Sequence, residues 1–108
     1  MIVISGGTKG VGRAFAETAA KEGAKLCLGG RDKNAGNEVI KEIFALNSDG
    51  IFVNCDLLNI EDCKNLFDAA YEKYGRLDGF FDYAGVTPIS PLDTCDEQTF
   101  DWVMDVNF

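Results

Sequence analysis

The chain has 108 residues, enough for one hydrophobic core, and its 46% hydrophobic and 26% charged residues are typical of a folded domain. A formal net charge of −8 opposes binding to nucleic acid or to an acidic membrane, and no apolar run is long enough to cross a bilayer. The sequence has no histidine and no Cys-x-x-Cys pair, so we expect no metal site.

The N-terminal third alternates a short apolar run with a helical stripe. The run Ile2-Val3-Ile4 predicts a buried strand, and the glycine-rich segment 5–12 leads from it into a helix that ends at Gly23. Helical spacing places the following residues on one apolar face of this helix: Val11, Ala14, Phe15, Thr18 and Ala19.

The middle of the chain repeats this alternation twice. Strands are predicted at Lys25–Leu28 and Ile51–Val53, with a turn at Asn47–Gly50. Asp32 and Asn59 are typical residues to cap the two helices that follow these strands, and Gly75 is typical of a helix end. The predicted inward stripes are Ala35, Val39, Ile43 and Leu46 in one helix, and Cys63, Leu66, Phe67, Ala70 and Tyr74 in the other.

The last third predicts one more strand and one more helix. The strand lies within Leu77–Tyr83, and two prolines make Thr87–Pro91 a loop. The final helix begins at Asp96, or at Thr94 with Glu97 as a capping box, and carries Phe100, Val103 and Met104. Strands that alternate with helices predict an α/β fold, a Rossmann-like doubly wound parallel sheet of about four strands with flanking helices, and incomplete.

The glycine-rich segment reads Ser5-Gly6-Gly7-Thr8-Lys9-Gly10-Val11-Gly12. Glycine permits a tight turn and a close approach of main chain to a ligand, and a helix N-terminus offers N–H groups to an anion. Three glycines at this spacing could also form a mere tight turn. A second strand ends about 20 residues after the last glycine, which favours a dinucleotide phosphate cradle.

Four motifs in order resemble the N-terminal part of the short-chain dehydrogenase/reductase family. The pattern Gly6-x-x-x-Gly10-x-Gly12 follows the first strand, with Ser5 where the family has threonine. Asp56-Leu57 follows the third strand, Asp82-Tyr83-Ala84-Gly85 stands where the family has Asn-Asn-Ala-Gly, and Asn107 lies late in the final helix. The resemblance covers essentially the whole chain.

This resemblance implies a nicotinamide cofactor and assigns roles to individual residues. Asp56 would accept a hydrogen bond from the adenine amino group, and Leu57 would pack on the adenine ring. Asn107 resembles the catalytic asparagine that holds a water in a proton relay. Tyr83 replaces an asparagine whose amide ties neighbouring strands, and a tyrosine cannot reproduce a two-ended amide. The expected cofactor-binding residues are Gly6, Thr8, Lys9, Gly10, Val11, Gly12, Arg31, Asp56, Leu57, Asp82, Ala84 and Gly85.

The end of the second strand bears on the choice of cofactor. A carboxylate there would accept a hydrogen bond from a free ribose 2′-hydroxyl, but this chain has Gly30 and then Arg31. A guanidinium binds phosphate with two parallel hydrogen bonds, and Lys9 could reach the same phosphate. Asp32 could instead reach the ribose, although it is equally well explained as a helix cap. NADP(H) is therefore expected in preference to NAD(H).

The expected function is hydride transfer between nicotinamide and an alcohol or carbonyl carbon. In the family this step uses a serine and a Tyr-x-x-x-Lys pair, and the 108 residues contain no Tyr-x-x-x-Lys. We therefore expect residues 1–108 to be the N-terminal part of a single domain whose catalytic portion is absent, and this chain alone to be inactive. The alternative is a nucleotide-binding or interaction module without turnover.

Location and assembly are the last expectations. No secretory signal is evident, so Cys27, Cys55, Cys63 and Cys95 are expected to be reduced thiols of a cytoplasmic protein. The resemblance also implies a homo-oligomer, because relatives commonly pair through helices from the fourth-strand region onward. Separately, we expect the isolated chain to be marginally stable and to associate through the bare edge and exposed aromatic residues of its fourth strand. Neither nucleic acid nor a membrane is expected as a partner.

Overall fold

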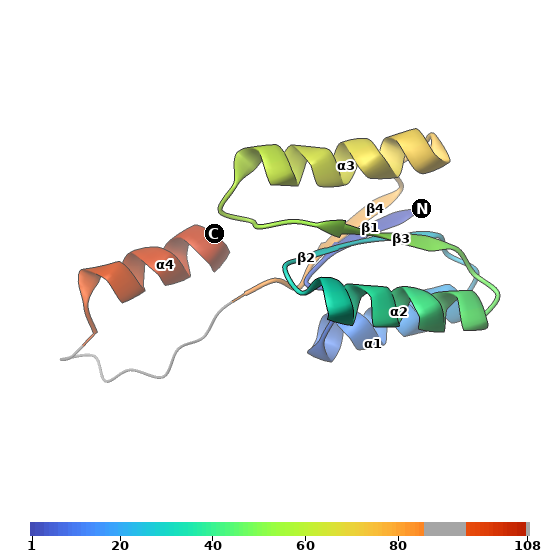
Figure 1. Ribbon diagram of the computed structural model, residues 1–108, viewed down its shortest axis with the longest axis horizontal. Coiled ribbons are helices and arrows are strands. Elements are labelled where there is room, and N and C mark those ends of the chain that lie inside the picture. The colour runs from blue at the N-terminus through green and yellow to red at the C-terminus, as the bar shows by residue number, and fades with distance from the viewer. Residues whose placement is uncertain (86–94, 108) are drawn as a thin grey trace.

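The computed structural model describes residues 1–85 and 95–107 (Figure 1). Strands and helices alternate along them in the order β1 (Ile2–Ser5), α1 (Gly10–Lys21), β2 (Leu26–Gly30), α2 (Lys33–Ala45), β3 (Gly50–Asn54), α3 (Ile60–Tyr74), β4 (Gly79–Asp82) and α4 (Glu97–Asn107). Each predicted strand and helix is present. The predicted loop Thr87–Pro91 and the alternative helix start at Thr94 lie outside the described residues.

The described strands form one parallel sheet in the order β3-β2-β1-β4. β1 pairs with β2 through Val3 opposite Cys27, and with β4 through Val3 opposite Phe80. β2 and then β3 therefore add to one side of β1, and β4 adds to the opposite side of β1. Such a reversal is the switch point at which open α/β sheets bind ligands, outside the carboxyl ends of the strands.

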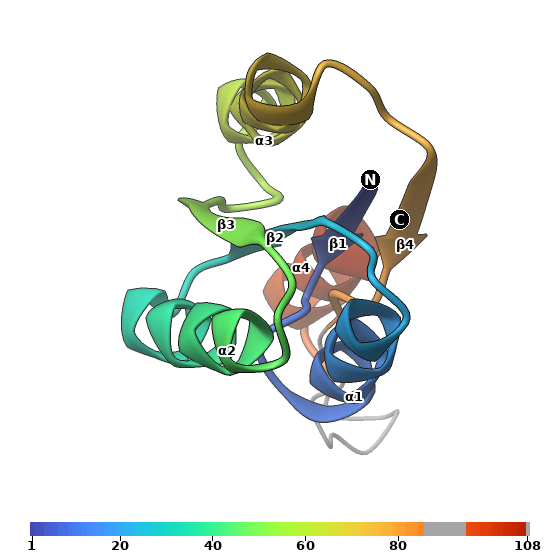
Figure 2. The same ribbon diagram turned by 90° about the vertical axis from the view of Figure 1, so that its right-hand side faces the viewer.

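Helices cover both faces of the sheet, as predicted for a doubly wound fold. Figure 2 shows α1 and α2 against one face and α3 against the other. Two core clusters match these layers: Ile4, Leu26 and Leu28 pack with α1 and α2, whereas Val3 and Cys27 pack with Leu66 and Ala70 of α3. Because both faces are buried, the strands are continuously apolar.

The buried face of α1 differs from the prediction. Its buried residues are Gly12, Ala16 and Ala20, with Phe15 and Ala19 half-buried, whereas Val11, Ala14 and Thr18 are exposed. Small side chains let the helix approach the sheet closely. Apolar spacing alone chose the wrong side because α1 carries alanine on several sides.

The helix termini follow the sequence signals. Asp32 and Asn59 accept hydrogen bonds from the N–H groups of Ala35 and Asp62 at the starts of α2 and α3. Asp96 accepts from Thr99 N–H at the start of α4. Gly23 and Gly75 take positive φ angles of 86° and 71° just after α1 and α3, a conformation that favours glycine.

The end of the described chain is less well covered. β4 lies at an edge of the described sheet, and Phe80, Phe81 and Tyr83 are at least 38% exposed. α4 lies beyond the carboxyl ends of the strands (Figure 1), and no residue of it is buried. Phe100 and Met104 of α4 are accordingly exposed.

Candidate functional site

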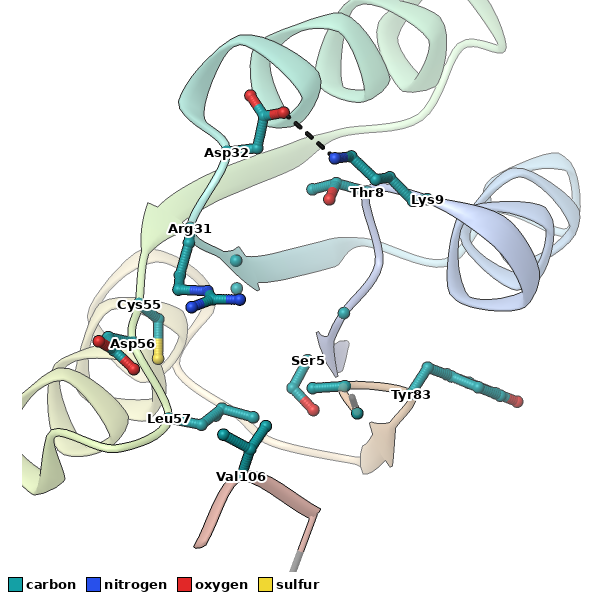
Figure 3. Close-up of a pocket in the computed structure, with 15 residues that line it drawn as sticks. Ser5, Thr8, Lys9, Arg31, Asp32, Cys55, Asp56, Leu57, Tyr83 and Val106 are labelled. Atoms are coloured by element: carbon teal, nitrogen blue, oxygen red, sulfur yellow. Dashed lines mark ion pairs between the residues drawn. The ribbon is translucent and has the colours of Figure 1, made fainter. Parts of the chain in front are cut away.

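A pocket of about 290 Å³ opens at the carboxyl ends of the strands (Figure 3). Each of the four strands contributes to its lining through its last residues or the loop that follows, and α4 adds one side chain. The lining residues are Ser5, Gly6, Thr8, Lys9, Gly29, Gly30, Arg31, Asp32, Cys55, Asp56, Leu57, Tyr83, Ala84, Gly85 and Val106. The pocket therefore lies at the switch point between β1 and β4.

The glycine loop forms the floor of the pocket from main chain. Gly6 has a φ of 71°, and a Cβ there would lie 2.6 Å from the backbone nitrogen of Ala84. A Cβ at Gly12 would lie 2.2 Å from the carbonyl oxygen of Gly6. Neither position has room for a side chain, so the loop, the start of α1 and the end of β4 touch backbone to backbone.

The N-terminus of α1 is open toward this loop. Lys9 is the N-cap residue in an extended conformation, and its side chain makes no capping hydrogen bond. The first turn of α1 contains no acidic residue. Free N–H groups and the positive end of the helix dipole make this terminus suitable for an anion such as phosphate.

Three charged residues stand at one side of the pocket. Lys9 Nζ lies 3.4 Å from Asp32 Oδ2, and Asp32 Oδ1 accepts a hydrogen bond from Ala35 N–H at 3.0 Å. The Ala35 N–H, and then Lys9, lower the pKa of Asp32. Arg31 has no hydrogen-bond or ion-pair partner among the described residues, and Figure 3 shows its guanidinium directed toward the middle of the pocket. Lys9 thus pairs with Asp32, a contact that the sequence did not predict.

The segment after β3 holds Asp56 in a tight turn. Asp56 Oδ1 accepts a hydrogen bond from Leu58 N–H at 3.0 Å, and Asp56 N–H donates to Asp62 Oδ2 at 3.0 Å. The turn uses one carboxylate oxygen of Asp56 and leaves the other for a ligand. Leu57 and Val106 of α4 both line the pocket (Figure 3).

Asp82 connects β4 to β1. Its Oδ1 accepts hydrogen bonds from Ser5 Oγ at 2.6 Å and from Ala84 N–H at 3.1 Å. The strands are therefore tied by a carboxylate and a hydroxyl. Asp82 therefore makes the side-chain link between strands that Tyr83, at the next position, cannot make. The Tyr83 ring instead points away from the pocket (Figure 3) and packs on Phe15, with 5.8 Å between ring centroids.

We compared the chain with known protein families, and one family matches its entire length. The family described as short chain dehydrogenase matches residues 1–108. The chain belongs to the short-chain dehydrogenase family. Its fold and the order of its motifs agree with this assignment.

Relatives in this family are oxidoreductases of greater length. An uncharacterised oxidoreductase of Listeria monocytogenes is 36% identical over 107 residues, which cover 99% of this chain and 43% of that protein. A 3beta-hydroxysteroid dehydrogenase of Mediterraneibacter gnavus is 37% identical over 108 residues, 99% of this chain and 39% of the relative. The chain thus spans about two fifths of the length of these curated relatives.

Solved structures of a reductase and an alcohol dehydrogenase superpose closely on this chain. An NADH-dependent reductase complexed with NAD has a TM-score of 0.87 at 30% identity, and the match covers 98% of this chain and 45% of that one. An alcohol dehydrogenase from Thermococcus sibiricus complexed with 5-hydroxy-NADP has a TM-score of 0.92 at 22% identity, with 98% and 46% covered. The second likeness concerns the fold alone.

The pocket brings together most of the residues predicted to bind a cofactor. Those that line it are Gly6, Thr8, Lys9, Arg31, Asp56, Leu57, Ala84 and Gly85. Gly10, Val11 and Gly12 lie in the first turn of α1 outside the lining, and Val11 is 70% exposed. Asp82 is not among the residues that line the pocket. Asn107, predicted as catalytic, places its Oδ1 3.1 Å from where a Cβ of Gly85 would be.

Several residues that line the pocket were not predicted as binding residues. Gly29, Gly30 and Cys55 end or follow β2 and β3, and Val106 precedes Asn107. Their position at the carboxyl ends of predicted strands was a usable signal, because all strands of a parallel sheet end at the same edge. Val106 had no such signal, since its place depends on how α4 folds back.

Two further features are properties of the described part of the chain. No group of His, Cys, Asp and Glu there is arranged to hold a metal ion. No described helix combines the length and apolar composition that a membrane span requires. Cys27 and Cys55 are buried free thiols, and burial raises their pKa values to about 12 and about 11.

Proposed function

We propose that this chain is the cofactor-binding part of an NADP(H)-dependent short-chain dehydrogenase. The whole protein would transfer hydride between the nicotinamide and an alcohol or carbonyl carbon. The observation that supports this most directly is the combination of a main-chain glycine floor with Arg31, a partnerless guanidinium aimed into the same pocket. The family and the NAD-bound structural neighbour at 30% identity favour a nicotinamide dinucleotide.

The residues of the pocket fit such a cofactor part by part. The glycine loop and the N-terminus of α1 would hold the pyrophosphate, because no side chain blocks the approach and the helix dipole is positive there. The free oxygen of Asp56 would accept from the adenine amino group, beside Leu57. Ala84 and Gly85 leave room for the ribose on the nicotinamide side. When bound, the cofactor supplies the hydride acceptor or donor.

The preference for NADP(H) rests on the charges at the rim. A ribose 2′-hydroxyl needs a free carboxylate oxygen, but both oxygens of Asp32 are engaged, by Ala35 N–H and by Lys9. A 2′-phosphate needs a cation, and Arg31 offers an unpaired planar guanidinium. The 2′-phosphate would also lie near the positive charge of Lys9, which is 73% exposed.

The catalytic role of this chain is confined to Asn107. It would hold a water near Gly85, where its side-chain oxygen already lies. The proton donor and the group that polarises the carbonyl would come from residues outside these 108, because the chain contains no Tyr-x-x-x-Lys. Hydride transfer is therefore proposed for the whole protein and nucleotide binding for this chain.

Titration with NADPH and NADH, before and after Arg31→Ala, tests the proposal. A charge-assisted hydrogen bond contributes about 1.5–3 kcal/mol, so the variant should bind NADPH about tenfold or more weakly and NADH almost unchanged. Lys33→Ala is the matched control, since Lys33 loses the same charge two residues away on an exposed position outside the pocket lining. Tighter binding of NADH than NADPH by the unaltered chain would contradict the cofactor preference.

The second candidate function is nucleotide binding without turnover. The absence of Tyr-x-x-x-Lys from the sequence favours it for this chain. A protein of this kind would bind NADPH but oxidise none in the presence of a panel of aldehydes and ketones. Turnover that depends on Asn107 would exclude the module and support the oxidoreductase.

A further inference from the structure

Two cysteines flank the segment that contributes Asp56 and Leu57 to the pocket lining. Cys55 directly follows β3, lines the pocket and is only 2% exposed, and its N–H donates to Gly30 O at 2.9 Å. Cys63 lies in the first turn of α3, is half-buried and packs against the same core cluster that contains Cys55. Burial, and then the neighbouring Cys63, raises the pKa of the Cys55 thiol. The two cysteines bracket the whole segment that is expected to hold the adenine.

Cys63 also fixes this segment directly. Its Sγ donates to Leu57 O at 3.7 Å, and Leu57 lines the pocket. The segment between the two cysteines is compact, because Asp56 N–H bonds Asp62 Oδ2 and Asn59 N–H bonds Asp56 O at 2.9 Å. Any change at the Cys63 sulfur is therefore transmitted to residues that line the pocket.

Metal binding does not account for this pair, since the described residues hold no group arranged for a metal ion. Thiol chemistry remains. Neighbouring thiols exchange readily with small disulfides, and disulfides in proteins of reducing compartments are commonly transient and redox-sensing.

We propose that Cys55 and Cys63 are a thiol-oxidation site, which closes to a disulfide in reaction with a low-molecular-weight disulfide and thereby weakens nucleotide binding. The formation of the bond stands by itself, whereas its effect on NADPH rests on the proposed function. The two parts are read out separately below.

The exchange balances in two steps. The Cys63 thiolate, at the more accessible sulfur, attacks the small disulfide, forms a mixed disulfide and releases one small thiolate. Cys55 then loses its proton to solvent and attacks the Cys63 sulfur, which forms the Cys55–Cys63 bond and releases the second small thiolate. Two protein thiols are oxidised and one small disulfide is reduced to two thiols. Burial raises the pKa of Cys55 to about 11, which agrees with its acting second, helped by proximity.

Closure of the bond would alter the pocket through Leu57. A disulfide sulfur carries no proton, so Cys63 could no longer donate to Leu57 O, and that carbonyl would lose its partner. The Cys55 sulfur would also have to turn toward α3 from its place in the pocket lining. By linkage, bound NADPH should disfavour the disulfide at equilibrium by the same free energy with which the disulfide weakens NADPH binding.

The test uses the full chain with Cys95→Ser, which removes the exposed fourth thiol. The protein is treated with oxidised glutathione, alkylated, digested with trypsin and analysed by mass spectrometry. Cleavage after Lys41 and Lys64 places both cysteines in one peptide, residues 42–64, whereas Cys27 falls in residues 26–31. The proposed bond therefore appears as a loss of two hydrogens within peptide 42–64, reversed by dithiothreitol.

The result expected is that loss, together with an NADPH dissociation constant raised about fivefold or more in the oxidised chain. Cys63→Ser should abolish both effects, and Cys63→Ala guards against a folding defect of the first variant. A glutathione adduct that persists on peptide 42–64, or a link between that peptide and residues 26–31, would overturn the site. Bond formation with unchanged NADPH affinity would overturn its effect on binding. If the reduced chain binds no dinucleotide, the proposed function fails, while the loss of two hydrogens still decides the oxidation site.

Discussion

Asp82 is the residue through which β1 and β4 are fixed to each other at the pocket. Its carboxylate receives the Ser5 hydroxyl and the Ala84 N–H, and the side chain of Ser5 is almost fully buried. A hydrogen bond to a charged acceptor contributes more than one to a neutral acceptor. This contact therefore stabilises the sheet at the same place where the glycine loop meets Ala84.

Ser5→Ala should lower the free energy of unfolding by about 1–2 kcal/mol, since the carboxylate loses its shortest donor. Ser48→Ala is the comparison, because Ser48 Oγ donates at the same 2.6 Å to a neutral carbonyl, that of Ala24. Urea denaturation of both variants measures the difference. A smaller loss for Ser5→Ala than for Ser48→Ala would show that the charge of Asp82 adds nothing.

At this scale the sequence predicted which residues gather but not how they pair. Arg31 and Asp56 were expected at the pocket from their places after predicted strands, and the structure brings them there. The pairing of Lys9 with Asp32 and of Ser5 with Asp82 joins residues 23 and 77 positions apart. Such contacts depend on strand order and loop conformation, which single-residue patterns do not encode.

Among the secondary-structure elements, α2 shows most clearly how a small residue sets the distance between layers. Gly36 is buried where α2 crosses β3, and a Cβ there would lie 2.3 Å from Cδ2 of Phe52. The ring of Phe52 occupies the space that a side chain at position 36 would need. The helix can pack at this distance only because position 36 has no Cβ.

Gly36→Ala should destabilise the protein by about 1–2 kcal/mol, because the clash outweighs the gain of about 1 kcal/mol in helix propensity. Adding Phe52→Leu should restore most of the loss by opening space for the methyl group. Thermal unfolding of the single and double variants provides the measurement. A Gly36→Ala protein more stable than the parent would mean that the ring moves aside without cost.

The elements themselves were predictable where their signals are local. The caps Asp32, Asn59 and Asp96 and the terminal glycines Gly23 and Gly75 act within a few residues of themselves, and all were placed correctly. The buried face of α1 was not, because it depends on which side of the helix meets β1. Gly12 and Ala16 are buried, although Val11 is more hydrophobic than either and is exposed.

Folding keeps two cysteine thiols and one tyrosine hydroxyl protonated to a higher pH than in the unfolded chain. Burial raises the pKa values of Cys27 to about 12 and of Cys55 to about 11, from an ordinary value of 9.0. Burial, and then the hydrogen bond to Asp49, also raises the pKa of Tyr74 above its ordinary value of 10.0. Each group is therefore protonated in the folded state at a pH where the unfolded chain has begun to release that proton.

The free energy of unfolding should consequently fall as pH rises above about 9, since the unfolded state then binds fewer protons than the folded state. Below about pH 9 these three groups are protonated in both states and do not make the free energy of unfolding depend on pH. Urea midpoints in the presence of a reductant, taken from neutral to alkaline pH, test this. Tyr74→Phe should make the decline shallower, with Tyr71→Phe on the exposed face of the same helix as control. A flat alkaline profile would show that the buried groups ionise freely.

Assembly is also a property of the whole molecule. β4 exposes Phe80, Phe81 and Tyr83 at an edge of the described sheet, and unpaired edges with exposed aromatic residues favour association. We expect the 108-residue chain to self-associate as its concentration rises, measured by light scattering coupled to size-exclusion chromatography. Phe80→Lys should shift it toward the monomer. A monodisperse monomer at all concentrations would contradict this expectation.

The close approach of Gly6 to Ala84 makes the floor of the pocket different in kind from its rim. Because the floor of the pocket is main chain pressed on main chain, no exchange of side chains can reshape it without moving a strand. The rim, by contrast, consists of Lys9, Arg31 and Asp32, which are exposed and replaceable. In the proposed function, side-chain substitutions would therefore leave the part of the pocket that meets the shared pyrophosphate unchanged, whereas a few surface substitutions at the rim would alter the preference between dinucleotides.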